Sequence, residues 1–367
     1  MSQTTRPGTR SIAAMTSSIS GIAAPAPSRA VHGITCVLVG MLFFAAQDAL
    51  MKTLLLTYPI WILLFIRSLL SVVVLLPLIL WLGGPHRLRT ALWPLHLLRA
   101  LLFGVGFTLF YTAFPFMGLA EASTIFFSAP LMIGAMAALF LGEKIGVHRI
   151  GALVVGFAGV LIAMNPGGDT FKWIALLPLV CAAFYAASQI LARRIGEAES
   201  SLTVGFWTLL FSGPIMLGTG WLLNQTITFG PEFHHLRWAI EIESVSALPV
   251  LLLLGAAGMG GYILVSRAYQ VADASVVAPF DYSYLPIATL LGWHFWGEVP
   301  AASTFVGMSL IVASGLYIGY REIRASRTEP SPALVAETIV APAAPQPVPA
   351  QDAGRAECTS DEIPPRA

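Results

Sequence analysis

Long apolar segments separated by short polar stretches occupy most of the chain. Ten such segments can be counted, at residues 31–51, 59–82, 97–116, 121–141, 147–164, 172–192, 202–223, 247–268, 273–296 and 302–320. A helix needs about 20 apolar residues to cross the hydrocarbon core of a bilayer. The pattern therefore predicts an all-α integral membrane protein with ten transmembrane helices.

The composition supports this class. The chain has 367 residues, of which 56% are hydrophobic and 11% are charged, and its mean hydropathy is +0.77. Soluble proteins carry about 25% charged residues. The formal net charge is only +1, which gives no reason to expect a nucleic acid as partner. We expect the lipid bilayer and a small-molecule substrate instead.

The two ends of the chain differ from the rest. Residues 1–30 are rich in Ser, Ala, Thr and Pro and lack the apolar core of a signal peptide. Residues 325–367 are rich in Pro and Ala. Such compositions do not bury enough apolar surface to fold, so both ends are predicted to be disordered tails.

The distribution of Lys and Arg predicts the orientation. With the N-terminus in the cytoplasm, the predicted outer loops hold only Lys52, Lys172 and Arg237. The other Lys and Arg near the ends of spans, Arg99 among them, then fall on the inner side. Positive charge collects on the cytoplasmic side of membrane proteins. We therefore predict a multi-pass protein of the inner (plasma) membrane with both termini in the cytoplasm.

An internal repeat divides the chain into two halves, 31–164 and 172–320. Asp48 in AAQDALMK matches Gln189 in AASQILARR, and Arg67 matches Thr208 at the same offset. The motif AEAS at 120–123 returns as ADAS at 272–275. Each half holds five predicted spans, and an odd number requires the halves to cross the membrane in opposite senses. Inverted repeats of this kind are typical of transporters, with the substrate site between them near the midplane.

Charged residues inside the spans are the first candidates for a functional site, because charges are costly in a bilayer. Asp48 lies about one helical turn from the outer end of its span, and Arg67 about two turns from the outer end of the next. Their depths are compatible with a pair. Such a pair either contacts substrate or gates the outer side, or else it is a structural ion pair that locks two helices.

Asp281 is a further intramembrane carboxylate. It lies between Pro279 and Pro286 with Tyr282 and Tyr284 beside it, and Pro130 occupies the corresponding span of the first half. Proline loosens a membrane helix, which is tolerated where the helix lines a cavity or packs on protein. Asp281 then binds a cationic group or takes up a proton, or it is hydrogen-bonded to a neighbouring helix.

Polar and aromatic residues on other spans complete the predicted site. Tyr111, Gln189 and Tyr262 are suited to line a cavity, although a residue of this kind taken alone more often serves packing. The predicted substrate-binding residues are Asp48, Arg67, Tyr111, Gln189, Tyr262, Asp281 and Tyr282. Glu121 and Asp273 begin related helices, where the helix dipole favours acids. Glu143 and Glu298 at the opposite ends are interpreted as structural joints.

Motifs of catalysis and cofactor binding are missing from the sequence. We find no Gly-rich phosphate loop, HExxH or nucleophile elbow, so neither an enzyme, a cofactor nor a metal is predicted. His234 and His235 are adjacent, but no further ligands accompany them, and we expect a solvated loop there. The GxxxG at 315–319 allows close helix packing, within one chain or, alternatively, in a homodimer.

Several segments together resemble a known family. They are FIRSLL, LAEASTIFFSAPLMIGAMAALFLGEK, SRAYQVADASVVAPFDYSYLPIATLLG and SGLYIGYRE. In order and spacing they resemble EamA-type transporters of the drug/metabolite transporter superfamily, over about residues 31–322. The resemblance implies ten helices in two inverted five-helix repeats, a central cavity, and export or import of a small metabolite.

The resemblance also bears on the substrate. YSYLP and SGLYIGYRE are similar to the S-adenosylmethionine-like and riboflavin-like branches. The chain departs from many members in its first span, where FFAAQDALMK replaces a Trp-Gly-x-x-Phe segment. We predict a secondary transporter that works by alternating access, with proton coupling through Asp281. The alternatives are a membrane-embedded enzyme and a non-transporting scaffold or sensor.

Overall fold

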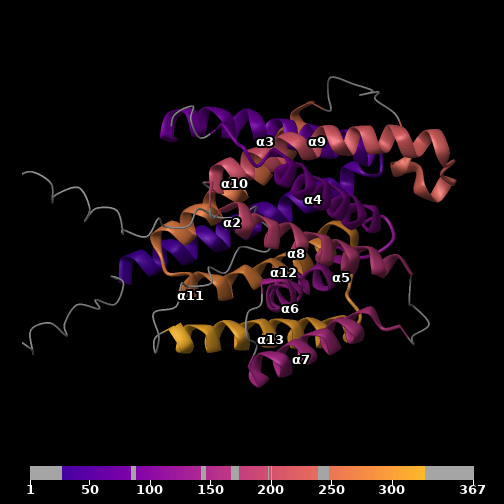
Figure 1. Cartoon of the computed structure of the whole chain (residues 1–367). Helices are drawn as coiled ribbons and strands as arrows, with labels where there is room; N and C mark the ends of the chain where they lie inside the picture. The colour runs from indigo at the N-terminus through magenta and orange to yellow at the C-terminus, as the bar shows by residue number, and fades with distance from the viewer. Residues whose placement is uncertain are drawn as a thin grey trace, which may run out of the picture.

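The computed structural model describes residues 27–83, 88–141, 146–166, 173–196, 198–199, 201–238 and 248–326. Every regular element in this part of the chain is helical (Figure 1). Nine helical segments of the described residues are long and apolar enough to cross a membrane. The predicted all-α membrane fold is therefore confirmed at this level.

The helices follow the order of the predicted spans. The first half of the chain forms α2 (Pro27–Leu54), α3 (Ile60–Gly83), α4 (Trp93–Ala113), α5 (Leu119–Phe126), α6 (Ala129–Leu141) and α7 (Val147–Met164). The second half forms η2 (Trp173–Ala175), α8 (Leu176–Gly196), α9 (Ser201–Thr226), η3 (Pro231–Leu236), α10 (Leu248–Val271), α11 (Ala274–Val277), η5 (Ala278–Ser283), α12 (Tyr284–Trp296) and α13 (Ala302–Ser326).

Two of the predicted spans are broken helices. The segment predicted at 273–296 consists of α11, the 3-10 helix η5 and α12, and it is not among the nine candidate spans of the described residues. The segment at 121–141 is interrupted at Phe127 and Ser128, directly before α6. A proline removes a backbone donor and clashes with the preceding turn, which accounts for breaks beside Pro130 and Pro279. The breaks give the backbone at this depth an irregular path.

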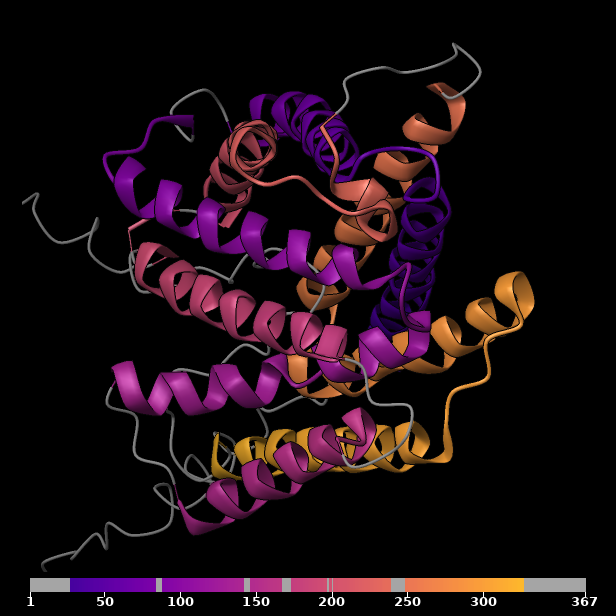
Figure 2. The same ribbon diagram turned by 90° about the vertical axis from the view of Figure 1, so that its right-hand side faces the viewer.

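The helices pack in matched pairs. α2 contacts α10, α4 contacts α8, α3 contacts α9, and α7 contacts α13. Figures 1 and 2 place α3 and α9 at one edge of the molecule and α7 and α13 at the opposite edge. The broken segments lie between these edges, where α5 contacts α12 and α2 also packs on α12. The middle of the molecule is thus built from α2, α4, α8, α10 and the broken helices.

Small residues hold α7 against α13. A Cβ atom at Gly159 would lie 2.9 Å from the carbonyl oxygen of Gly307, so only glycine allows this approach. Ser314 donates a hydrogen bond of 2.5 Å to the carbonyl oxygen of Ala152. Close contacts of this type are a usual means of helix association in membranes. The small residues of α7 therefore serve packing within the chain.

The ends of the described chain bear on the predicted tails. α2 begins at Pro27 and α13 ends at Ser326, so each helix extends a few residues into a segment predicted to be a tail. The remainder of both tails lies outside the described residues. So do Glu143 and Lys144 at the end of the fourth predicted span.

Candidate functional site

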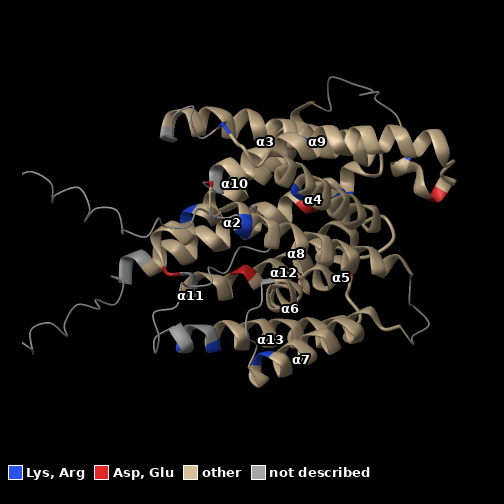
Figure 3. Ribbon diagram, in the orientation of Figure 1, with Lys and Arg blue, Asp and Glu red and all other residues tan. Residues whose placement is uncertain are grey.

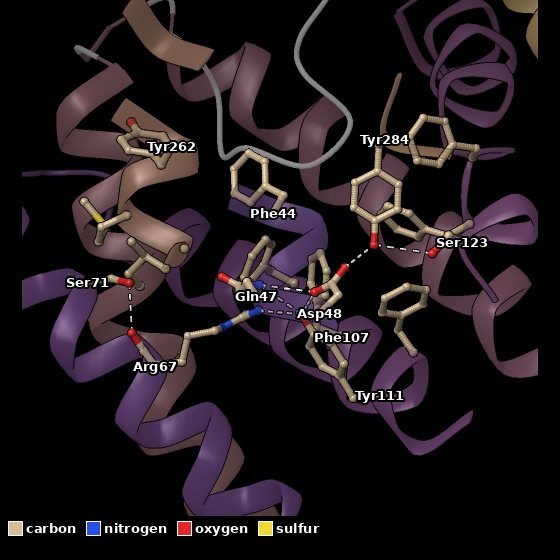
Figure 4. Close-up of a pocket in the computed structure, with 17 residues that line it drawn as sticks. Phe44, Gln47, Asp48, Arg67, Ser71, Phe107, Tyr111, Ser123, Tyr262 and Tyr284 are labelled. Carbon is tan, nitrogen blue, oxygen red and sulfur yellow. Dashed lines mark hydrogen bonds between the residues drawn. The ribbon is translucent and has the colours of Figure 1, made fainter. Parts of the chain in front are cut away.

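A cavity lies at the middle of the molecule, between α2, α3, α4, α5, α9, α10 and α12. Its volume, counted as the space open to the centres of water molecules, is about 50 Å³. Aromatic residues make up most of the wall: Phe44, Phe103, Phe107, Phe110, Tyr111, Phe126, Phe127, Tyr262 and Tyr284. The polar side chains of the wall are Gln47, Asp48, Arg67, Ser71 and Ser123. The wall thus combines flat apolar rings with a small set of polar groups (Figure 4).

Asp48 is the centre of the polar network. Its Oδ1 accepts a hydrogen bond of 2.8 Å from the Tyr111 hydroxyl and one of 3.3 Å from the Gln47 amide. Its Oδ2 accepts a hydrogen bond of 2.5 Å from the Tyr284 hydroxyl. The carboxylate is only 5% exposed, and a buried charge requires such partners. These bonds join α2 to α4 and to α12.

Arg67 reaches the same network from α3. Its guanidinium donates a hydrogen bond of 2.9 Å to the Tyr111 hydroxyl and lies over the rings of Phe107 and Tyr111. The Tyr111 hydroxyl therefore bridges Arg67 and Asp48, which form no direct ion pair. A guanidinium carries five N–H donors, and in the described part of the chain one of these nitrogens bonds Tyr111. The remaining donors are available to a ligand of the cavity.

The cavity brings together four of the seven predicted site residues. Asp48, Arg67, Tyr111 and Tyr262 line it, whereas Gln189, Asp281 and Tyr282 are not in its wall. Gln189 is fully buried on α8. Its amide nitrogen donates a hydrogen bond of 2.6 Å to the Tyr185 hydroxyl, and its amide oxygen accepts one of 3.3 Å from Arg99.

Asp281 occupies a separate position in η5. Its Oδ2 accepts a hydrogen bond of 2.7 Å from the Tyr269 hydroxyl. Its Oδ1 has no hydrogen-bond partner among the described residues, although the side chain is only 3% exposed. The neighbouring Tyr282 packs its ring 5.6 Å from that of Phe127, a residue of the cavity wall. Asp281 is therefore next in the chain to Tyr282, a residue that packs against the cavity wall.

Sequence reasoning missed Gln47, Ser123 and Tyr284. Gln47 precedes Asp48 in an otherwise apolar stretch, and its polarity was the available signal. Tyr284 lies in the YSYLP segment, of which only Tyr282 is among the predicted site residues. Ser123 belongs to the AEAS repeat motif and donates weakly, at 3.4 Å, to the Tyr284 hydroxyl. Its small size permits α5 to approach that ring.

A second polar cluster closes the end of α2, one turn beyond Asp48. Lys52 forms an ion pair with Glu298 and donates 2.9 Å to the carbonyl oxygen of Met117. The other carboxylate oxygen of Glu298 accepts 3.0 Å from the backbone N–H of Leu119, the first residue of α5. The predicted joint at Glu298 thus connects α2, α5 and the loop after α12.

The interpretation of Arg99 as a cation of the inner loops is corrected by the structure. α4 begins at Trp93, so Arg99 lies well inside this helix and is fully buried. It donates to Thr208, to Gln189 and, at 3.2 Å, to the carbonyl oxygen of Ser188. Gln189 and Thr208 are the repeat counterparts of Asp48 and Arg67.

His235 also differs from the expectation of a solvated loop. Residues 227–238, here called the α9 strap, fold back from α9, and His235 within the strap is fully buried. Trp61 of α3 donates 2.9 Å to the carbonyl oxygen of Leu236. Burial, together with the neighbouring His234, lowers the pKa of His235 from 6.5 to about 4, although a contact with the backbone of Thr112 acts to raise it. The buried imidazole is therefore neutral at pH 7.

Comparison with known proteins identifies the family. The EamA-like transporter family matches residues 31–165 and 172–320. The chain belongs to this family. A riboflavin transporter of Vibrio cholerae serotype O1 is 31% identical over 267 residues, which cover 71% of this chain and 82% of the relative. An S-adenosylmethionine uptake transporter of Rickettsia bellii is 26% identical over 293 residues, 80% of this chain and 95% of the relative.

A solved crystal structure supports the same fold. It is similar with a TM-score of 0.52 and 18% sequence identity, over 80% of this chain and 99% of that chain. The family match and the named relatives identify the EamA-like protein as a multi-pass membrane transporter for small metabolites. The prediction of a transporter rather than an enzyme is confirmed by the family.

Proposed function

We propose that this EamA-like transporter carries a planar, uncharged heteroaromatic metabolite of the flavin type through the cavity around Asp48. The observation that carries the proposal is the ring-rich wall, which includes Phe107, Phe126 and Tyr284 and is interrupted by a few polar groups. Aromatic rings stack favourably on other flat rings. The similar protein of Vibrio cholerae is a riboflavin transporter, which supports the same substrate class here.

S-adenosylmethionine is the second candidate substrate. The similar Rickettsia transporter covers more of the chain, and a carboxylate such as Asp48 attracts a cationic sulfonium group. Asp48, however, already accepts hydrogen bonds from Gln47, Tyr111 and Tyr284. The group with donors to spare is the Arg67 cation, which repels a second positive charge in a region of low dielectric constant. Because Asp48 is already satisfied and Arg67 is not, the site favours an uncharged ring over a cation.

Alternating access is the proposed mechanism, with residues 31–164 and 172–320 as two inverted five-helix repeats. The packing supports this arrangement, because α2 corresponds to α8 and α4 to α10 in the sequence repeat. The contact of α2 with α10 is therefore matched by the contact of α8 with α4. A cavity of about 50 Å³ holds only a few water molecules. The helices must consequently separate before a metabolite enters.

The proposed setting is the inner membrane, with both termini in the cytoplasm. The start of α2 and the end of α13 lie on the same side of the molecule, and much of the Lys and Arg collects there (Figure 3). In this orientation the Lys52–Glu298 cluster closes the outer end of the cavity. One chain supplies the whole cavity wall, and a homodimer remains a further proposal.

Proton coupling through Asp281 is the proposed energy source. Two features support it: the side chain is buried, and Oδ1 has no hydrogen-bond partner among the described residues. A carboxylate in that position is suited to bind a proton during the transport cycle. The break at η5 allows its surroundings to change when the helices move.

Transport by the purified protein in proteoliposomes tests the proposal. Riboflavin and S-adenosylmethionine are supplied in turn, with and without a pH gradient. We expect saturable riboflavin uptake that a gradient accelerates. Saturable uptake of S-adenosylmethionine without riboflavin uptake would make S-adenosylmethionine the substrate in place of riboflavin. A transport rate that does not change with the gradient would reject proton coupling.

A further inference from the structure

The orientation of the Gln47 amide is fixed by its neighbours. Its nitrogen donates 3.3 Å to Asp48 Oδ1 and 3.3 Å to the Tyr111 hydroxyl. An ionised carboxylate only accepts hydrogen bonds, so the nitrogen and not the oxygen of the amide must face Asp48. The amide oxygen, Oε1, consequently turns away from Asp48 (Figure 4).

Gly258 of α10 makes room for this oxygen. A Cβ atom at position 258 would overlap Gln47 Oε1, and both residues belong to the cavity wall. No donor from the described residues forms a hydrogen bond with Oε1. The amide therefore presents an unused acceptor at the wall where α2 meets α10.

Arg67 presents the complementary group at the same wall. Its bond to Tyr111 leaves further N–H groups unused, and stacking over Phe107 holds the guanidinium plane. The cavity thus offers an acceptor on Gln47 and donors on Arg67 beside a set of aromatic rings. A flat ring with an N–H next to a carbonyl or a ring nitrogen satisfies both groups at once.

We propose that Gln47 and Arg67 select the substrate by this edge. In the flavin ring it is the imide edge: its N–H donates to Gln47 Oε1, and an adjacent carbonyl oxygen accepts from Arg67. The inference rests on the proposed function and deepens it from a ring-shaped substrate to a hydrogen-bonding pattern. The amino edge of adenine has the same donor–acceptor pattern, and the experiment distinguishes a flavin substrate from one that contains adenine.

The test compares uptake of riboflavin with uptake of its N3-methyl derivative, in which a methyl group replaces the imide hydrogen. The wild-type protein is expected to prefer riboflavin by on the order of tenfold, because methylation leaves a buried acceptor unsatisfied. Gln47→Leu removes the acceptor and is expected to bring the two rates close to parity. Gln225→Leu, at an exposed position of α9, is the matched control and should keep the preference.

Gly258→Ala provides a second variant that removes no polar group. The added methyl group displaces Oε1, which is the end of a flexible side chain, so the fold is expected to survive while the preference falls. Melting temperatures and quenching of flavin fluorescence by each purified variant show that the protein is folded and measure binding directly. These two measurements distinguish a loss of substrate preference from a loss of folded protein, should Gln47→Leu lower the protein yield.

The outcomes separate the inference from the proposed function. Riboflavin uptake with equal uptake of the N3-methyl derivative by wild-type protein overturns the inference alone. Uptake of S-adenosylmethionine or adenosine without any riboflavin uptake overturns the flavin assignment and the imide edge together. A preference for riboflavin that persists in both Gln47→Leu and Gly258→Ala also rejects the role of Gln47.

Discussion

Asp48 is held by side chains from three different segments of the chain, and this makes it the most constrained residue of the cavity. Gln47 contacts it from α2, Tyr111 from α4 and Tyr284 from α12. A buried charge with several donors is strongly destabilised when one member of the network is removed. The residue therefore fixes both the shape of the cavity and the contact between helices of the two halves.

Asp48→Asn is expected to reduce transport by on the order of tenfold or more, because an amide nitrogen does not accept the bonds that Tyr111 or Tyr284 donates. The measurement is the initial rate of riboflavin uptake together with the melting temperature of the purified variant. Asp273→Asn is the matched control, since Asp273 is exposed at the start of the broken segment. Equal rates for wild type and Asp48→Asn would remove Asp48 from the site.

Asp281→Asn is expected to abolish the acceleration of uptake by a pH gradient while leaving exchange of substrate across the membrane measurable. The physical reason is that an amide, unlike a carboxylate, does not bind a proton at the pH values used to set up the gradient. Tyr269→Phe removes only the hydrogen bond to Oδ2 and should preserve the response to the gradient. An unchanged gradient response in Asp281→Asn would exclude this carboxylate from coupling.

The α9 strap lies far from the cavity and is held in place by hydrogen bonds and a ring contact of its own. Asn224 and Trp61 both donate to the carbonyl oxygen of Leu236, at 3.0 Å and 2.9 Å. The buried His235 of the strap has its ring 5.8 Å from that of Phe116. The strap is thereby fastened over α3, α9 and the turn after α4.

The strap is expected to loosen in acid. The pKa of His235 is lowered in the folded protein, from 6.5 to about 4, so the neutral imidazole is the form that docks. The stability it contributes is complete above pH 6.5 and is lost as the pH falls from 6.5 towards 4. Melting temperatures over this range should therefore fall more steeply in wild type than in His235→Phe. His294→Gln, at an exposed position of α12, should follow the wild-type curve.

At the scale of the whole molecule, the order of spans was predictable because apolar length alone determines which segments cross a bilayer. The helix breaks beside Pro130 and Pro279 were predictable for a similar reason, since proline acts locally. The clustering of Phe44, Phe107 and Phe126 was not, because phenylalanine in a membrane helix faces lipid or protein with equal ease. Only the packing of α2, α4 and α5 brings these rings together.

Charged residues were the harder part of the prediction. Arg99 lies near the start of a predicted span, where sequence position does not distinguish a lipid-facing cation from one buried against α8 and α9. Asp281 and Gln189 were selected for polarity inside a span, yet both lie behind the cavity wall. Polarity identifies residues with a buried partner, and the partner is known only when the helices are assembled.

Glu298→Gln is expected to increase access to the cavity from outside, since it removes the charge that holds Lys52 and weakens the bond to the start of α5. A single cysteine at Ser71, in a chain whose native cysteines are replaced by alanine, reports this access. Its labelling by an impermeant maleimide should be several-fold faster in Glu298→Gln. Glu232→Gln, on the exposed strap, should leave the rate unchanged.

The two ties on α2 have a consequence for the membrane when no substrate is present. Asp48 and Lys52 are one turn apart on the same face, so the bond to Tyr284 and the ion pair with Glu298 hold α2 and the α12 segment together at two levels. While both persist, the cavity of about 50 Å³ between the helices has room for only a few water molecules. In the proposed proton-coupled cycle, this closed arrangement would keep an idle carrier from leaking protons, so that the gradient drives only the movement of substrate.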